Sequence, residues 1–165
     1  MKASLAVLAA LAAAVTLASV AAAGPDAAKQ RVAITSKILP NGEFVFTPLQ
    51  AGALKRDSGT MSGNWESVPS HFVMREGQKV EVFDHPVVWT FLGKRGSLTI
   101  RERSEWVYLG NDGNGDGVED AVAFGTWKVV RATGQYAQLA GGGRSGHAGL
   151  GREWFARYEG FVTLP

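Results

Sequence analysis

The sequence predicts an all-β protein: a small antiparallel up-and-down β-barrel of about eight strands, preceded by a signal peptide. Glycine is frequent, and its 21 residues all lie after position 23, where they make up about 15% of the chain against roughly 7% in average proteins. Turn signals such as Pro40-Asn41-Gly42 separate short segments rich in β-branched and aromatic residues, as in sheets built from hairpins. Beyond residue 23, no segment keeps an apolar stripe at helical spacing over three turns.

Residues 1–23 have the three parts of a secretory signal. Lys2 is basic, an alanine- and leucine-rich run follows to about Val20, and the small residues Ala21 to Ala23 precede a glycine. An uncleaved membrane anchor is the alternative, because the run approaches the roughly 20 residues that span a bilayer. No basic cluster follows the run, which favours cleavage. We therefore expect a secreted protein, extracellular or periplasmic, with no membrane segment after cleavage.

Residues 24–165 have the size of a single domain with one hydrophobic core. The chain carries 17 basic and 15 acidic residues, and this near balance argues against nucleic acid as a partner. There is no cysteine, so the fold is held without disulfides. Export without cysteine, from an alanine-rich signal, fits a bacterial protein.

Nine segments have the composition and spacing of strands. In the segment 97–108, Leu98, Ile100, Trp106 and Tyr108 share one face, as in a half-buried strand. Strands with such short links hide their edges by closing into a barrel or by packing as two sheets, and hairpin-length links favour the barrel. The glycine cluster 140–151 is a low-complexity segment. The predicted strands are 31–39, 43–47, 58–65, 71–75, 79–91, 97–108, 118–130, 135–141 and 154–164.

The last third of the chain reads GTWKVV at 125–130, TGQYA at 133–137 and LAGGG at 139–143. This pattern resembles that of small bacterial secreted proteins related to the allene oxide cyclase and dirigent barrels. The resemblance extends over about 52–164. It implies an eight-stranded antiparallel barrel with an apolar lumen, often oligomeric. In the plant relatives the lumen guides cyclisation of a reactive epoxide or coupling of phenolic radicals, whereas many bacterial members are uncharacterised, so the resemblance implies a fold more than an activity.

Large aromatic side chains on two neighbouring strands are the predicted ligand-binding residues, with core packing as the alternative. They are Trp89, Phe91, Trp106 and Tyr108. The pleat places Trp89 and Phe91 on one face, and the sequence leaves open whether that face is luminal. Glu102 shares the face of Trp106 and is the candidate catalytic acid or base. Its alternative role is a structural ion pair with an arginine.

The segment 112–120 has the spacing of a calcium loop. Oxygen ligands would come from the side chains of Asp112, Asn114, Asp116 and Asp120 and from the backbone of Val118. A polar hairpin loop is the alternative, because turns select the same residue types. A bound Ca²⁺ would be structural.

The three histidines lie far apart in the sequence. Without the close spacing of zinc ligands, we expect His71, His85 and His147 to be scattered surface residues. Ser145 lacks the context of a hydrolase nucleophile.

The leading hypothesis is a non-catalytic binder of a small apolar molecule, or a scaffold. One alternative is a cyclase, isomerase or dirigent-like enzyme that acts in the barrel lumen. The other is a calcium-stabilised interaction module. Apolar residues on both faces of segment 87–92 also favour a homo-oligomer.

Overall fold

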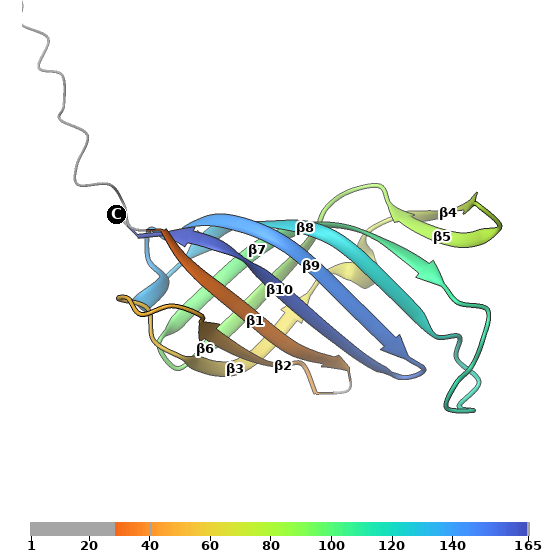
Figure 1. Ribbon diagram of the computed structural model, residues 1–165, viewed down its shortest axis with the longest axis horizontal. Helices are drawn as coiled ribbons and strands as arrows, with labels where there is room; N and C mark the ends of the chain where they lie inside the picture. The colour runs from red at the N-terminus through yellow and green to blue at the C-terminus, as the bar shows by residue number, and fades with distance from the viewer. Residues whose placement is uncertain (1–28, 40, 165) are drawn as a thin grey trace, which may run out of the picture.

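Residues 29–39 and 41–164 are described by a computed structural model and form ten β-strands and two short 3-10 helices (Figure 1). The predicted signal peptide lies outside these residues. Within them, no helix is long and apolar enough to cross a membrane. The elements are β1 (Lys29–Leu39), β2 (Glu43–Pro48), β3 (Asp57–Gly63), η1 (Trp65–Ser67), β4 (Ser70–Arg75), β5 (Gln78–Phe83), β6 (Val87–Gly93), β7 (Gly96–Tyr108), β8 (Ala121–Ala132), η2 (Gly134–Tyr136), β9 (Ala140–Leu150) and β10 (Glu153–Thr163).

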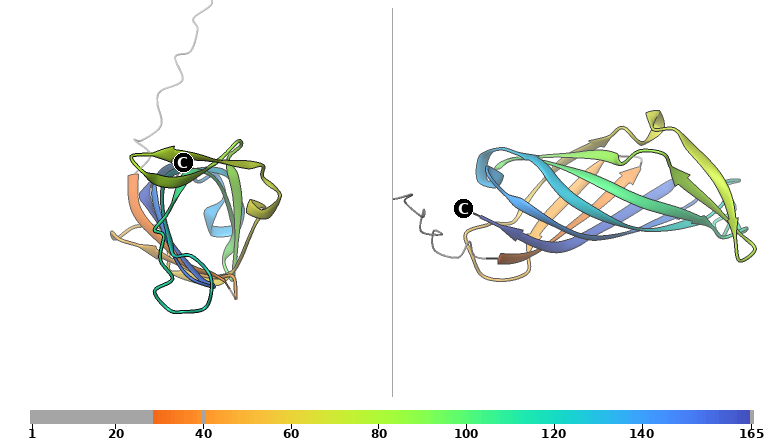
Figure 2. Two further views of the ribbon diagram at one scale, coloured as in Figure 1. Left: turned by 90° about the vertical axis from the view of Figure 1, so that its right-hand side faces the viewer. Right: turned by 90° about the horizontal axis from the view of Figure 1, so that it is seen from above.

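Eight of the strands close into an antiparallel barrel, which confirms the predicted architecture. Their order around the barrel is β1-β2-β3-β6-β7-β8-β9-β10, and β10 pairs with β1 to complete the ring (Figure 2). Each strand thus pairs with its neighbours along the chain, except that the β4–β5 hairpin is inserted between β3 and β6. Closure satisfies the edges that an open sheet of this length would expose.

The predicted strand 79–91 is two strands in the structure. β5 ends at Phe83 and β6 begins at Val87, and the bend between them contains Pro86, which has no N–H to donate to a strand ladder. Residues 96–102 of β7 pair with β6, and residues 105–108 pair with β5. The β4–β5 hairpin therefore extends beyond the barrel at the end where β7 finishes (Figure 1).

The glycine cluster was predicted wrongly, because it forms the long strand β9. β9 pairs with β8 on one side and with β10 on the other, whereas most of the predicted strand 135–141 is η2 and a turn. Glycine is generally depleted in strands. Here Gly142 and Gly143 lie directly against the backbone of Trp127 and Glu159, where a Cβ atom would collide. Glycine therefore permits the close approach of three strands at this place.

The barrel interior is packed solid at the end near η2. Tyr136 of η2 is buried and packs edge to face on Phe46, with ring centroids 5.1 Å apart. Its hydroxyl donates a hydrogen bond of 3.0 Å to the buried carboxylate of Asp57. This end of the core contains Ile34, Phe44, Phe46, Phe91, Leu98, Ile100, Tyr136, Leu139 and Val162.

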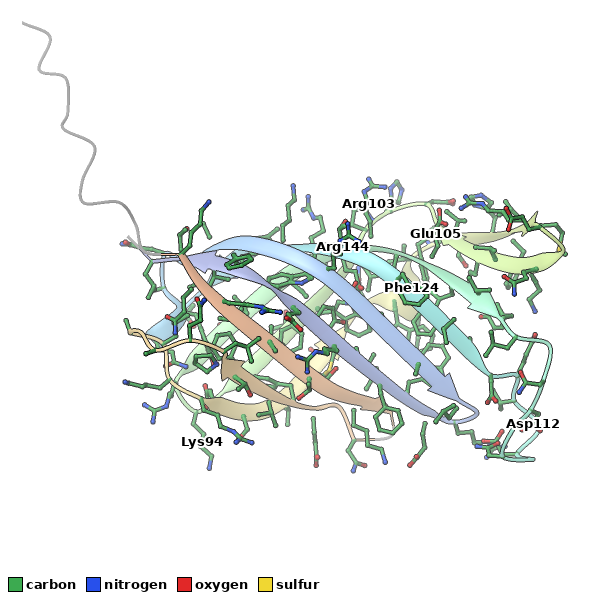
Figure 3. All side chains as sticks on the ribbon, viewed as in Figure 1. Lys94, Arg103, Glu105, Asp112, Phe124 and Arg144 are labelled. Atoms are coloured by element: carbon green, nitrogen blue, oxygen red, sulfur yellow. The ribbon has the colours of Figure 1, made fainter. Side chains whose placement is uncertain are left out.

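Several large side chains stand on the outer wall. Phe124 of β8 is 69% exposed and Phe161 of β10 is 53% exposed. Figure 3 shows Phe124 directed away from the barrel, as are Arg103 and Arg144. Exposed apolar rings are what a homo-oligomer would cover, and the oligomer stays a prediction.

Candidate functional site

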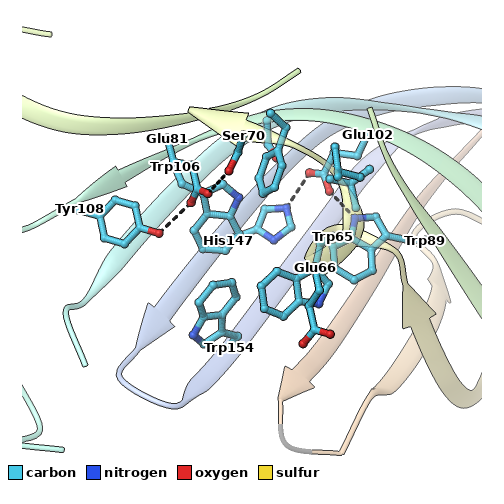
Figure 4. Close-up of a pocket in the computed structure, with 14 residues that line it drawn as sticks. Trp65, Glu66, Ser70, Glu81, Trp89, Glu102, Trp106, Tyr108, His147 and Trp154 are labelled. Carbon is cyan, nitrogen blue, oxygen red and sulfur yellow. Dashed lines mark hydrogen bonds and ion pairs between the residues drawn. The ribbon is translucent and has the colours of Figure 1, made fainter. Parts of the chain in front are cut away.

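The end of the barrel opposite η2 is hollow. A cavity of about 210 Å³ lies between the barrel wall and the β4–β5 hairpin (Figure 4). This volume is below the roughly 300–1,000 Å³ of sites for drug-sized molecules, so the cavity fits a smaller ligand. The lining residues are Trp65, Glu66, Val68, Ser70, Glu81, Phe83, Val87, Trp89, Glu102, Ser104, Trp106, Tyr108, His147 and Trp154.

Aromatic rings form a continuous wall of this cavity. The ring of Trp154 lies between those of Trp65 and Trp106, with centroids 5.3 Å and 4.7 Å away. Trp106 in turn lies 5.1 Å from the imidazole of His147. The wall therefore runs from η1 at the outside to β9 inside the barrel. Large ring faces of this kind favour flat apolar guests.

The carboxyl group of Glu102 lies at the inner end of the cavity and is 1% exposed. Trp89 Nε1 donates to it over 2.7 Å, His147 Nε2 lies 2.6 Å from it, and the Tyr158 hydroxyl donates over 3.4 Å. The hydroxyl of Ser145 donates a fourth hydrogen bond. Four donors around one carboxyl group match the acceptor capacity of a carboxylate. Glu102 is therefore held by these four side chains and not by the ion pair with an arginine that the sequence left open.

The expectation of a surface residue is wrong for His147, whose side chain is 0% exposed. Because the Glu102 carboxylate can only accept, Nε2 of His147 carries the proton between them. In the neutral imidazole Nδ1 is then an acceptor, and among the described residues it has no hydrogen-bond partner. In Figure 4 the imidazole lies between Glu102 and the indoles of Trp106 and Trp154. A buried polar atom without a partner is costly and marks a place where a ligand can bind. His71 and His85 are exposed, as expected.

Two tyrosine hydroxyls beside the carboxylates have altered acidity. Burial raises the pKa of Tyr158 well above its ordinary value, and the charge and hydrogen bond of Glu102 raise it further. Burial also raises the pKa of Tyr108, together with its 2.8 Å hydrogen bond to Glu81 and the charges of Glu81 and Glu119. Both hydroxyls therefore stay protonated at neutral pH and act as donors.

The structure brings together four of the predicted site residues: Trp89, Glu102, Trp106 and Tyr108. Phe91 is different, because it lies in the solid part of the core. Its ring centroid is 5.2 Å from that of Phe44 and 5.7 Å from that of Tyr158, and it does not line the cavity. The face of β6 that carries Trp89 and Phe91 is the inner one.

Ser145 and His147 belong to the site and were missed from the sequence. They lie two residues apart, which places both on one face of a strand, and β9 directs that face inward. This spacing is a usable signal. It was hidden by the surrounding glycines, which obscured the strand itself.

The predicted calcium ligands all lie in the loop between β7 and β8: Asp112, Asn114, Asp116, Val118 and Asp120. The Asp112 carboxylate accepts backbone N–H bonds of 2.8 Å from Gly115 and Gly117, and that of Asp120 accepts one of 3.1 Å from Gly151. These contacts fit the alternative of a polar turn. In the described part of the chain, no three His, Cys, Asp or Glu side chains are grouped to hold a metal ion. Calcium binding stays a prediction.

Comparisons with known proteins give no relative: no family, no curated protein and no solved structure matches the chain. The candidate function therefore rests on the residues of the cavity.

Proposed function

We propose that the protein binds a small, flat, largely apolar molecule in the cavity at the open end of the barrel. The observation that supports this most directly is the aromatic wall of Trp65, Trp154 and Trp106, which leads to a buried polar group. The apolar body would pack on the indole faces, and one polar group of the ligand would meet His147. The β4–β5 hairpin would cover the bound ligand from outside.

The resemblance to the allene oxide cyclase and dirigent barrels supports the same proposal. Those barrels hold apolar molecules in the lumen, and this chain has a closed eight-stranded barrel with a hollow end. We propose that this protein is a secreted member of that group, acting as a binder.

Titration with naphthol, a small flat fluorescent molecule, tests the binding site. We expect saturable binding of about one molecule per chain, and Trp106→Ala should weaken it about tenfold because an aromatic contact is lost. Phe124→Ala is the matched control, since this ring is 69% exposed on the outer face of the adjacent strand. Binding that never saturates, or that responds equally to both variants, would contradict the proposal.

A second candidate is an enzyme that moves a proton, such as an isomerase or cyclase. The observation in its favour is the Glu102–His147 pair: a carboxylate fixes one ring nitrogen, the other has no hydrogen-bond partner among the described residues, and His147 belongs to the lining of the cavity. This arrangement suits a general base, because the carboxylate orients the imidazole and the second ring nitrogen is left to take a proton. His147 would take a proton from a carbon next to a carbonyl, leave an enolate, and return the proton to another position.

Exchange of the methyl protons of acetophenone in deuterated water, followed by NMR, tests this candidate. An enzyme of this type should accelerate the exchange, and His147→Gln should abolish the acceleration while naphthol still binds. Exchange no faster than in buffer would leave the binder as the supported function.

A further inference from the structure

We infer that the ligand of the cavity is a cation, namely a small protonated amine with an apolar body. The inference rests on the proposed function, because it assigns a charge to the same ligand. Three carboxylates reach the cavity, those of Glu66, Glu81 and Glu102, and its lining contains no lysine or arginine. Every arginine in the described part of the chain is exposed. The charged groups of the wall are therefore acidic.

Two of these carboxylates are available to a ligand. Glu81 accepts a 2.6 Å hydrogen bond from Ser70 and a 2.8 Å bond from Tyr108, which hold it in place without neutralising it. Glu66 is exposed at the outer part of the cavity. Within the described residues, neither glutamate forms an ion pair. Negative charge concentrated beside a cavity with apolar walls attracts a cation.

His147 independently favours a cationic ligand. In the neutral imidazole its Nδ1 atom is a buried acceptor with no hydrogen-bond partner among the described residues, and it needs a donor rather than another acceptor. A protonated amine offers N–H donors. His147 belongs to the lining of the cavity, but its imidazole is fully buried, so a ligand would reach Nδ1 through a small shift of the lining side chains.

The indole faces complete the preference for a cation. Ammonium groups bind over tryptophan faces because the ring quadrupole is negative there, and four tryptophans line the cavity. A cation–π contact within the protein already exists beside the cavity. The ammonium of Lys79 lies 4.3 Å from the ring centroid of Tyr108 and 4.9 Å from that of Phe72. Among the described residues, the ion-pair partner of this lysine is Glu119, at 3.3 Å, and not Glu81.

Calorimetric titration of the purified protein with three matched compounds tests the inference: phenethylamine, phenethyl alcohol and phenylacetate. They share a phenyl ring and differ in charge. We expect the amine to bind roughly tenfold more tightly than the alcohol, as cation–π and carboxylate contacts together imply, and the acid to bind most weakly. Equal affinity for amine and alcohol, or preference for the acid, overturns the cation inference but leaves the proposed apolar site standing. Failure of all three compounds to bind overturns both.

A pair of surface variants separates a local effect from the general charge of the protein. Glu66→Gln removes a carboxylate from the cavity and should weaken amine binding several-fold, with alcohol binding unchanged. Glu76→Gln removes the same charge from the turn of the β4–β5 hairpin, outside the cavity, and should leave both affinities unchanged. The effect of Glu66→Gln should shrink at high salt, because the group is exposed. Equal responses of amine binding to the two variants overturn the assignment of Glu66 to the ligand.

Discussion

Replacement of Glu102 tests whether its carboxylate organises the interior of the barrel. Glu102→Leu keeps a side chain of similar size but removes the acceptor for four donors. The N–H groups of Trp89 and His147 are rigid and cannot turn to another acceptor. Each buried donor left unpaired costs about 1–3 kcal/mol, so we expect a loss of about 4 kcal/mol. That is a large part of the roughly 5–15 kcal/mol by which domains are stable.

Glu102→Gln should cost much less. The amide oxygen can accept from Trp89 and Tyr158, and the amide NH₂ can donate to the Ser145 hydroxyl and to His147 Nε2. The second contact requires the imidazole proton to move to Nδ1, because Nε2 must now accept. We expect roughly 1–2 kcal/mol of destabilisation, as hydrogen bonds to a charged group are replaced by neutral ones.

Urea unfolding followed by circular dichroism gives the two free energies, and nitrogen NMR of His147 reports the change of tautomer. Glu105→Gln is the control, because Glu105 forms a surface ion pair with Arg75 and such pairs contribute no more than about 1 kcal/mol. A Glu102→Leu protein as stable as the wild type would refute the argument that these donors depend on the carboxylate.

Two further predictions concern other carboxylates. Burial raises the pKa of Asp57, but hydrogen bonds from the backbone of Arg95, Ser58 and Lys94 and from Tyr136 outweigh it, so the pKa lies below 3.8. The stabilisation is therefore complete above the unfolded pKa and is lost as the pH falls through the folded pKa. Asp57→Asn should cost on the order of 2 kcal/mol at pH 7 and less at acidic pH in urea unfolding; a pH-independent difference would contradict this. If the acidic loop binds calcium, millimolar Ca²⁺ should raise the melting temperature, and Asp116→Ala should abolish that response. If Ca²⁺ does not change the melting temperature of the wild-type protein, the loop is a polar turn without a calcium site.

The all-β class and the closed barrel were predictable because they follow from local sequence patterns. Alternation in segment 97–108 assigns the correct residues to the inner face of β7, and the glycine turns mark most strand ends. β9 was not predictable in the same way. Its glycines are required by the closeness of the backbone of Trp127 and Glu159, and the distance between strands is a property of the folded barrel that no local pattern records.

The site was predictable only where it lies on consecutive strands. Trp89, Glu102 and Trp106 come from β6 and β7, which a tight hairpin joins, so strand alternation alone places them together. His147 is 45 residues from Glu102 in the sequence. Their contact depends on β8 pairing with both β7 and β9 in a particular register, and a shift of one residue would turn His147 outward.

The break between β5 and β6 has a consequence for the kinetics of the molecule. Only four residue pairs join β5 to β7, and residues 103 and 104 of β7 pair with neither β5 nor β6. The eight strands of the ring are closed without the β4–β5 hairpin. We therefore expect the hairpin to detach in a local unfolding step that needs less free energy than global unfolding. Since Glu81 and Phe83 of β5 line the cavity, this local step would set the rate at which a ligand of the proposed site exchanges, while the rest of the barrel stays folded.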